Sequence, residues 1–139
     1  MKVGIISCSG EEIPEGTISR IATRMVLEKL RPEETVTICL PLFLAGGEEE
    51  RQFAKNFPTI AVDGCEKMCA KLATDKLSGK TDGVIVVSDY LKNQGIKAPN
   101  KRRNFTEEEM KIAEKVAEEI ARRVDEILSR GERATHAEL

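Results

Sequence analysis

Four cysteines in a chain of 139 residues have the chemistry to bind a metal ion or to transfer sulfur: Cys8, Cys39, Cys65 and Cys69. Cysteine thiolates are ligands for Zn²⁺ and for iron–sulfur clusters, and they are also the nucleophiles of redox and sulfur-transfer enzymes. We expect a cytoplasmic protein, because the first apolar run is too short for a signal-peptide core and no stretch reaches the ~20 residues of a membrane span. Thiols stay reduced in that compartment, which favours metal or redox chemistry over disulfides.

Short apolar runs alternate with helical periodicity along the chain. Strands are predicted over four segments: 2–7, 35–40, 59–63 and 83–88. Helices are predicted over 17–30, from about 47 to 56, over 65–79, and from Thr106 to near Gly131, with a loop over 91–104. Thr17 or Gly16 could cap the first helix, and Thr106 with Glu109 matches a capping box. We therefore expect one α/β domain over 1–131 and a flexible C-terminal tail over 132–139.

This strand–helix alternation predicts a parallel sheet covered by helices on both faces, a three-layer sandwich. A Rossmann- or flavodoxin-like arrangement with four mostly parallel strands in the order 2-1-3-4 is the expected topology. The carboxyl ends of parallel strands lie at one edge of the sheet, and ligands bind in the crevice there.

The four cysteines follow three of the predicted strands. Cys8 comes after the first, Cys39 ends the second, and Cys65 follows the third with Cys69 one helical turn later. We therefore expect all four to bind a metal ion at this edge, with zinc as the first candidate. Three alternatives remain open: an iron–sulfur cluster, thiol redox or persulfide transfer with Cys65 or Cys8 as nucleophile, and simple core packing.

Three short motifs carry a resemblance to a known family: Cys8-Ser9-Gly10, Cys39-Leu40-Pro41, and Asp63-Gly64-Cys65 followed by Cys69. Over residues 3–90 the chain resembles the DGC-domain family, which takes its name from the Asp-Gly-Cys motif and is described as zinc-binding through its cysteines. The resemblance implies that Cys8, Cys39, Cys65 and Cys69 are metal ligands. It implies no reaction.

Other enzyme classes do not fit the sequence. A low-molecular-weight phosphatase needs an arginine shortly after the first-strand cysteine, but Pro14 occupies that position and the first arginine is Arg20. The only histidine, His136, lies in the predicted tail, so a catalytic histidine pair has no base. A net charge of −2 predicts no nucleic-acid surface. The protein is thus more consistent with a non-catalytic metal-binding role, in which the ion and an unidentified protein are the partners.

Four polar residues near the predicted edge have roles that the sequence does not decide. Asp63 is expected to hydrogen-bond its own turn, or to orient a ligand. Asp89 and Tyr90 are expected to follow the fourth strand into the same crevice. Arg20 could favour a thiolate at Cys8 or bind an anion.

Overall fold

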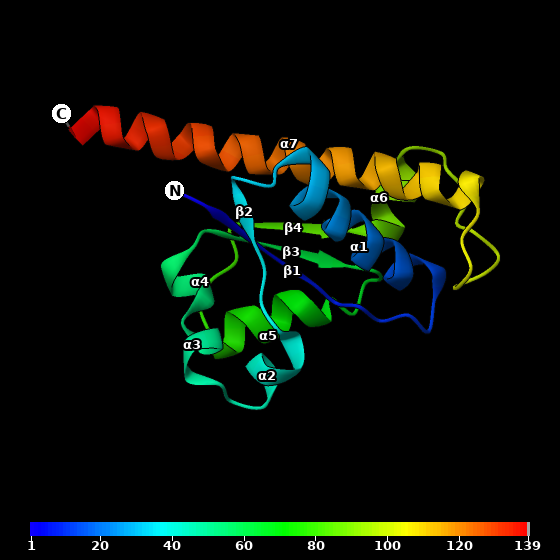
Figure 1. Cartoon of the computed structure of the whole chain (residues 1–139), viewed down its shortest axis with the longest axis horizontal. Coiled ribbons are helices and arrows are strands. Elements are labelled where there is room, and N and C mark those ends of the chain that lie inside the picture. The colour runs from blue at the N-terminus through cyan, green and yellow to red at the C-terminus, as the bar shows by residue number, and fades with distance from the viewer. Residues whose placement is uncertain (139) are drawn as a thin grey trace.

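A four-stranded parallel sheet in the order β2-β1-β3-β4 forms the centre of the computed structural model (Figure 1). Its strands are β1 (Val3–Ser7), β2 (Thr35–Val36), β3 (Thr59–Asp63) and β4 (Gly83–Val86). This confirms the predicted α/β class and strand order. The structure describes the backbone of residues 1–138 and the side chains as far as Gly131. Of the predicted tail over 132–139, residue 139 and the side chains, including that of His136, therefore lie outside the described residues.

Helices cover both faces of the sheet (Figure 1). They are α1 (Pro14–Met25), the π-helical turn η1 (Val26–Leu30), α2 (Leu40–Leu44), α3 (Glu48–Arg51), α4 (Phe53–Asn56), α5 (Cys69–Leu77), α6 (Val87–Asn93) and α7 (Glu107–Glu138). Val3 and Ile5 of β1 pack with α1, α6 and α7, whereas Ile6 packs with α4 and α5. The alternation of side chains along each strand thus divides the core into two layers. No helix in this described part of the chain is long and apolar enough to cross a membrane.

Two elements near the amino-terminal half differ from the prediction. The first helix begins at Pro14, so neither Gly16 nor Thr17 caps it. Proline is suited to the first helical position, since its missing N–H would have no partner there. The second strand is only Thr35–Val36 long, and Cys39 precedes α2 instead of ending a strand.

The second half departs from prediction at helix boundaries. The predicted helix over 65–79 begins only at Cys69, and the predicted fourth strand over 83–88 turns into α6 at Val87. The capping box of α7 is confirmed on one side, because the Thr106 N–H donates to Glu109 Oε2 at 3.0 Å. The helix then passes Gly131, where its end was predicted, since one glycine costs only about 1 kcal/mol inside a long helix.

Candidate functional site

Cys8 lies at the carboxyl edge of the sheet, in contact with the turn that follows β3. Its backbone N–H donates to Val62 O at 2.9 Å, which extends the pairing of β1 with β3 by one residue. Its half-buried Sγ accepts a hydrogen bond from the Gly64 N–H at 3.3 Å. The first cysteine and the Asp63-Gly64-Cys65 turn, 56 positions apart in sequence, therefore form one local structure.

Ser19 of α1 makes a second polar contact with Cys8. The Ser19 hydroxyl is buried and donates to Gly16 O at 2.6 Å, and its Oγ lies 3.4 Å from Cys8 Sγ. A hydroxyl carries one proton, so with that bond made the Ser19 oxygen is available as an acceptor in the second contact. A metal ion that binds the Cys8 sulfur would take the place of the thiol proton.

Asp63 holds the start of α5, although it lies six residues before the helix. Its buried carboxylate accepts hydrogen bonds from the backbone N–H groups of Ala70 at 2.7 Å and Lys71 at 3.1 Å. These are the second and third residues of α5, the ones that a residue directly before the helix normally caps. Burial raises the pKa of the Asp63 carboxyl, and the two hydrogen bonds oppose that effect. The aspartate thereby positions the backbone that carries Cys69.

Cys65 and Cys69 do not share a helical turn, contrary to the prediction. Cys65 is half-buried in the turn before α5, and Cys69 is the exposed first residue of the helix. Met68 between them has a left-handed backbone conformation with φ of 49°. Because Asp63 caps α5 at Ala70, the helix cannot begin at Cys65, and the chain makes a separate turn there.

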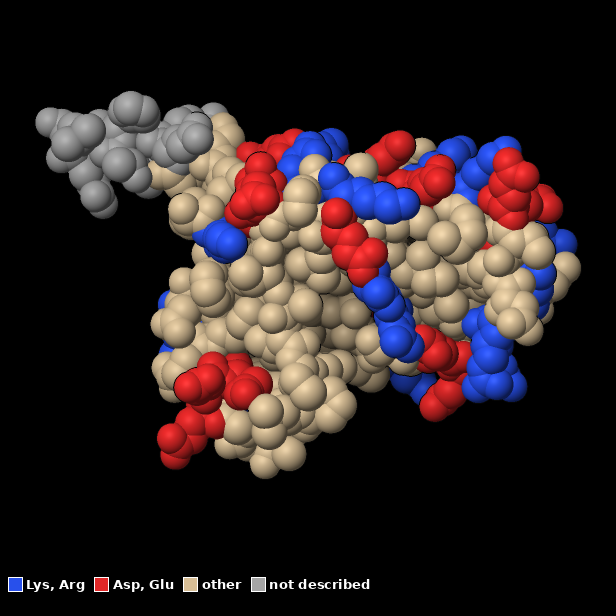
Figure 2. Space-filling model, in the orientation of Figure 1, with Lys and Arg blue, Asp and Glu red and all other residues tan. Residues whose placement is uncertain are grey.

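Cys39 is exposed where the chain enters α2. The Phe43 N–H donates to Cys39 O at 3.0 Å, and the fully buried Phe43 ring anchors this short helix. Leu42 and Leu44 of α2 are about half exposed, and Figure 2 shows the surface over α2 as largely free of charged side chains. Cys39 therefore lies next to an exposed apolar surface.

A cavity of about 390 Å³ lies between the end of β1 and the segment around Cys39. Its polar lining includes Ser7, Ser9, Thr37 and Arg20. Arg20 forms an ion pair with Glu11, so its guanidinium binds a carboxylate rather than the Cys8 thiol. This cavity gives a small molecule or a partner side chain room against the residues that flank Cys8 and Cys39 in sequence.

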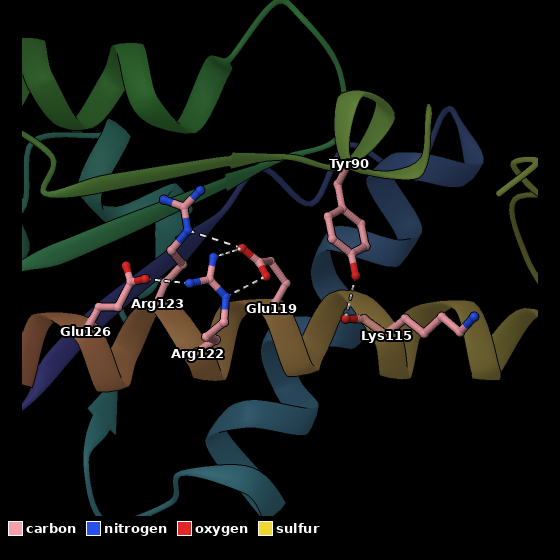
Figure 3. Close-up of polar contacts among 6 residues, drawn as sticks. All are labelled: Tyr90, Lys115, Glu119, Arg122, Arg123 and Glu126. Atoms are coloured by element: carbon pink, nitrogen blue, oxygen red, sulfur yellow. Dashed lines mark hydrogen bonds and ion pairs between the residues drawn. The ribbon is translucent and has the colours of Figure 1, made fainter. Parts of the chain in front are cut away.

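Asp89 and Tyr90 lie elsewhere than predicted. Both belong to α6 and line a different groove, along β4 and beside Arg123 of α7. The Tyr90 hydroxyl donates to Lys115 O at 3.4 Å (Figure 3). These two residues therefore do not form part of the candidate cysteine site.

All four thiols are free, with no disulfide between them. As far as side chains are described, no three Cys, His, Asp or Glu residues come close enough together to hold a metal ion. The structure thus brings Cys8 against the turn of Cys65, and places Cys39 and Cys69 in exposed positions at the starts of α2 and α5.

Comparison with known proteins gives one result. A family model described as the DGC domain matches residues 4–120, most of the chain. Searches of curated proteins and of solved structures found no match.

Proposed function

The chain belongs to the DGC domain family, and we propose that Cys8, Cys39, Cys65 and Cys69 together bind one zinc ion. Four free thiols fit the donor set of a tetrahedral zinc–thiolate site. The same donors could hold an iron–sulfur cluster, which is the alternative cofactor. Both forms require reduced thiols, in keeping with a cytoplasmic location.

The contact between Cys8 and the Asp-Gly-Cys turn carries this proposal. The Gly64 N–H that donates to Cys8 Sγ would also stabilise that sulfur as a thiolate ligand. Cys65 directly follows Gly64, and the Asp63 carboxylate binds the backbone N–H of Ala70, the residue after Cys69. Zinc binding then requires side-chain rotations, which the exposed Cys39 and Cys69 can make with little loss of packing.

The position of the ligands favours an exchangeable ion over a buried structural one. Two of the four cysteines are exposed, and the cavity of about 390 Å³ lies beside the end of β1. The exposed apolar surface of α2 next to Cys39 suits contact with a protein. We therefore propose that the protein holds zinc and passes it to a partner protein.

Metal analysis of the full chain tests the proposal. Protein purified without oxygen is expected to contain one zinc per chain, measured by elemental analysis. Replacing Cys65 by serine removes one thiolate, and we expect the zinc content to fall several-fold and the affinity for zinc, measured by competition with a chelator, to fall by about tenfold or more. Cys8→Ser, Cys39→Ser and Cys69→Ser are expected to act similarly.

Met68→Leu provides the matched control, since it changes a sulfur-containing side chain between Cys65 and Cys69 without removing a thiol. Its zinc content should equal that of the wild type. Unchanged zinc content in Cys65→Ser would remove this residue from the site. Iron with a visible absorbance band would instead identify an iron–sulfur protein.

Thiol chemistry is the second candidate function, with Cys8 or Cys65 as nucleophile in redox or persulfide transfer. The observation in its favour is the pair of polar contacts at Cys8 Sγ, together with a cavity that is lined by the neighbouring residues Ser7 and Ser9. The two candidates differ in thiol accessibility. In native protein as purified, bound zinc should protect all four thiols from a thiol reagent until a chelator is added, whereas a metal-free nucleophile should react at once.

A further inference from the structure

The loop between α6 and α7, residues 94–106, is strongly basic. It carries four cations and no acid: Lys97, Lys101, Arg102 and Arg103. The chain as a whole has a net charge of −2, so this concentration of positive charge is local. All four residues are exposed, and Figure 2 shows Lys and Arg side chains, with acids beside them, at the end of the molecule where this loop lies in Figure 1. We call residues 94–106 the basic loop.

Contacts with α1 and α7 hold the basic loop in place. The buried Thr17 hydroxyl donates to Arg102 O at 2.7 Å, and Arg102 Nη1 donates to Glu12 O at 3.0 Å. Lys101 forms an ion pair with Glu109 at 3.2 Å. Apolar side chains of the loop also pack against the main core: Ile96, Ala98 and Phe105. A loop ordered in this way presents its cations to a ligand with little further loss of conformational entropy.

The two arginines of the basic loop are not neutralised by a carboxylate. Within the described part of the chain, Lys101 is the one residue of this loop that forms an ion pair. Arg102 donates to a carbonyl oxygen, and Arg103 has neither a hydrogen bond nor an ion pair there. A guanidinium group has five N–H donors, so most of those of Arg102 and Arg103 are available to a ligand.

A cavity of about 720 Å³ lies between the basic loop and the segment that leads into α1. The loop lines it with the consecutive residues from Asn100 to Asn104, and Glu12 and Pro14 line the other side. This lining holds three cations and one acid, and Pro14 is its one apolar residue. Most pockets for organic ligands are lined mainly by apolar side chains. The cavity therefore suits a small, hydrophilic anion.

We propose that this cavity binds a phosphate group, either the free ion or that of a small phosphate ester. The planar guanidinium groups of Arg102 and Arg103 each offer a pair of N–H donors that matches two phosphate oxygens. The side-chain amides of Asn100 and Asn104 supply further N–H donors in the same lining. The site contains none of the four cysteines, so it does not depend on the proposed zinc.

A phosphate suits this lining better than a carboxylate does. Glu12 already brings a carboxylate to the cavity, yet in the described structure it forms no ion pair with either arginine. A phosphate ester carries up to two negative charges and three acceptor oxygens, so one phosphate can bind both guanidinium groups at once.

Calorimetric titration of the full chain at low ionic strength, with inorganic phosphate and with glycerol phosphate, tests the proposal. We expect a dissociation constant of about 1 mM or lower for at least one of them, and weaker binding when sodium chloride is added. Equal affinities would identify the free ion as the ligand, and tighter binding of glycerol phosphate would identify an ester. Both results support a phosphate site.

Variants of the arginines locate the binding. Arg103→Gln removes a side chain with no polar partner in the described structure, and we expect it to weaken phosphate binding by about tenfold. Arg130→Gln is the matched control, because it removes an exposed arginine of α7 outside the cavity, and its affinity should equal that of the wild type. In nuclear magnetic resonance spectra, the side-chain amide signals of Asn100 and Asn104 should shift when phosphate is added. Circular dichroism checks that each variant is folded.

Three results would overturn the proposal. The first is the absence of binding for both phosphate compounds, including a chain that binds a short polyglutamate peptide at this loop instead. The second is an equal loss of affinity in Arg103→Gln and Arg130→Gln, which would show a diffuse attraction to positive charge. The third is phosphate binding that leaves the Asn100 and Asn104 side-chain signals unchanged.

Discussion

Replacing Asp63 by alanine is expected to lower the free energy of unfolding by about 2 to 3 kcal/mol. The substitution removes the acceptor for the Ala70 and Lys71 N–H groups. The Ala70 N–H, which is buried, is then left without a partner. Loss of a helix cap costs about 1 kcal/mol, and an unsatisfied buried N–H adds about 1 to 3 kcal/mol. Urea denaturation at neutral pH, followed by circular dichroism, measures the change. A loss below about 0.5 kcal/mol, as for an ordinary surface substitution, would contradict the capping role.

Asp63→Asn is the matched control, because it keeps one acceptor oxygen and nearly the same shape. We expect it to lower the free energy of unfolding by about 1 kcal/mol. Its NH₂ group takes the place of one carboxylate oxygen and cannot accept the hydrogen bond which that oxygen accepted. If the aspartate positions Cys69 for zinc, Asp63→Ala should also weaken zinc binding, by about tenfold. Asp63→Asn should have the smaller effect on zinc as well as on stability.

The pH dependence of the same pair tests the electrostatics of Asp63. Burial raises its pKa above the ordinary value of 3.8. A raised pKa in the folded state contributes stability that is complete at acid pH, below the unfolded pKa, and is lost as the pH rises through the folded value. Asparagine does not titrate, so the stability advantage of the wild type over Asp63→Asn should shrink as the pH rises from about 3.8. An advantage that grows over this range would show that the folded pKa is lowered.

The overall topology was predictable because it follows from the alternation of strands and helices. Boundaries were less predictable where tertiary contacts determine them. Val87 continues an apolar run and so resembles strand, yet it is the buried first residue of α6. Periodicity alone cannot distinguish these two environments in so short a run. The start of α5 depends on a carboxylate six residues upstream, which no local capping pattern reveals.

The candidate site was likewise predictable where it follows from the topology and not where it depends on tertiary contacts. Parallel strands bring their carboxyl ends to one edge, and this was enough to predict that Cys8 would meet the turn of Cys65. The prediction that Cys65 and Cys69 share one helical turn depended on where α5 begins, and it was wrong. The contacts of Arg20 and Tyr90 could not be predicted for a different reason. Their partners, Glu11 and Lys115, lie in other segments of the chain, and only the folded structure shows which segments are neighbours.

Replacing Gly16 by alanine is expected to lower the free energy of unfolding by about 3 kcal/mol or more. A Cβ there would lie 1.7 Å from Gly10 O, a backbone atom that cannot move without displacing the loop after Cys8. Alanine inside a helix is ordinarily about 1 kcal/mol better than glycine, so the clash must outweigh a favourable change. Urea denaturation of Gly16→Ala measures the balance, and a stabilised variant would contradict the close approach.

Gly64→Ala extends this test to the motif itself, because its Cβ would lie 2.7 Å from the Gly16 N and 2.8 Å from the Gly16 Cα. Gly10→Ala is the matched control in the same cluster, since its Cβ would meet only Cys8 Sγ, at an ordinary 3.8 Å. We expect Gly64→Ala to be destabilised like Gly16→Ala, and Gly10→Ala to remain near the wild type. Gly64 must then lack a side chain so that its N–H can approach Cys8 while its backbone touches α1. The glycine between Asp63 and Cys65 would thus be required by packing, and the two residues beside it would be free to hold a helix and to offer a thiol.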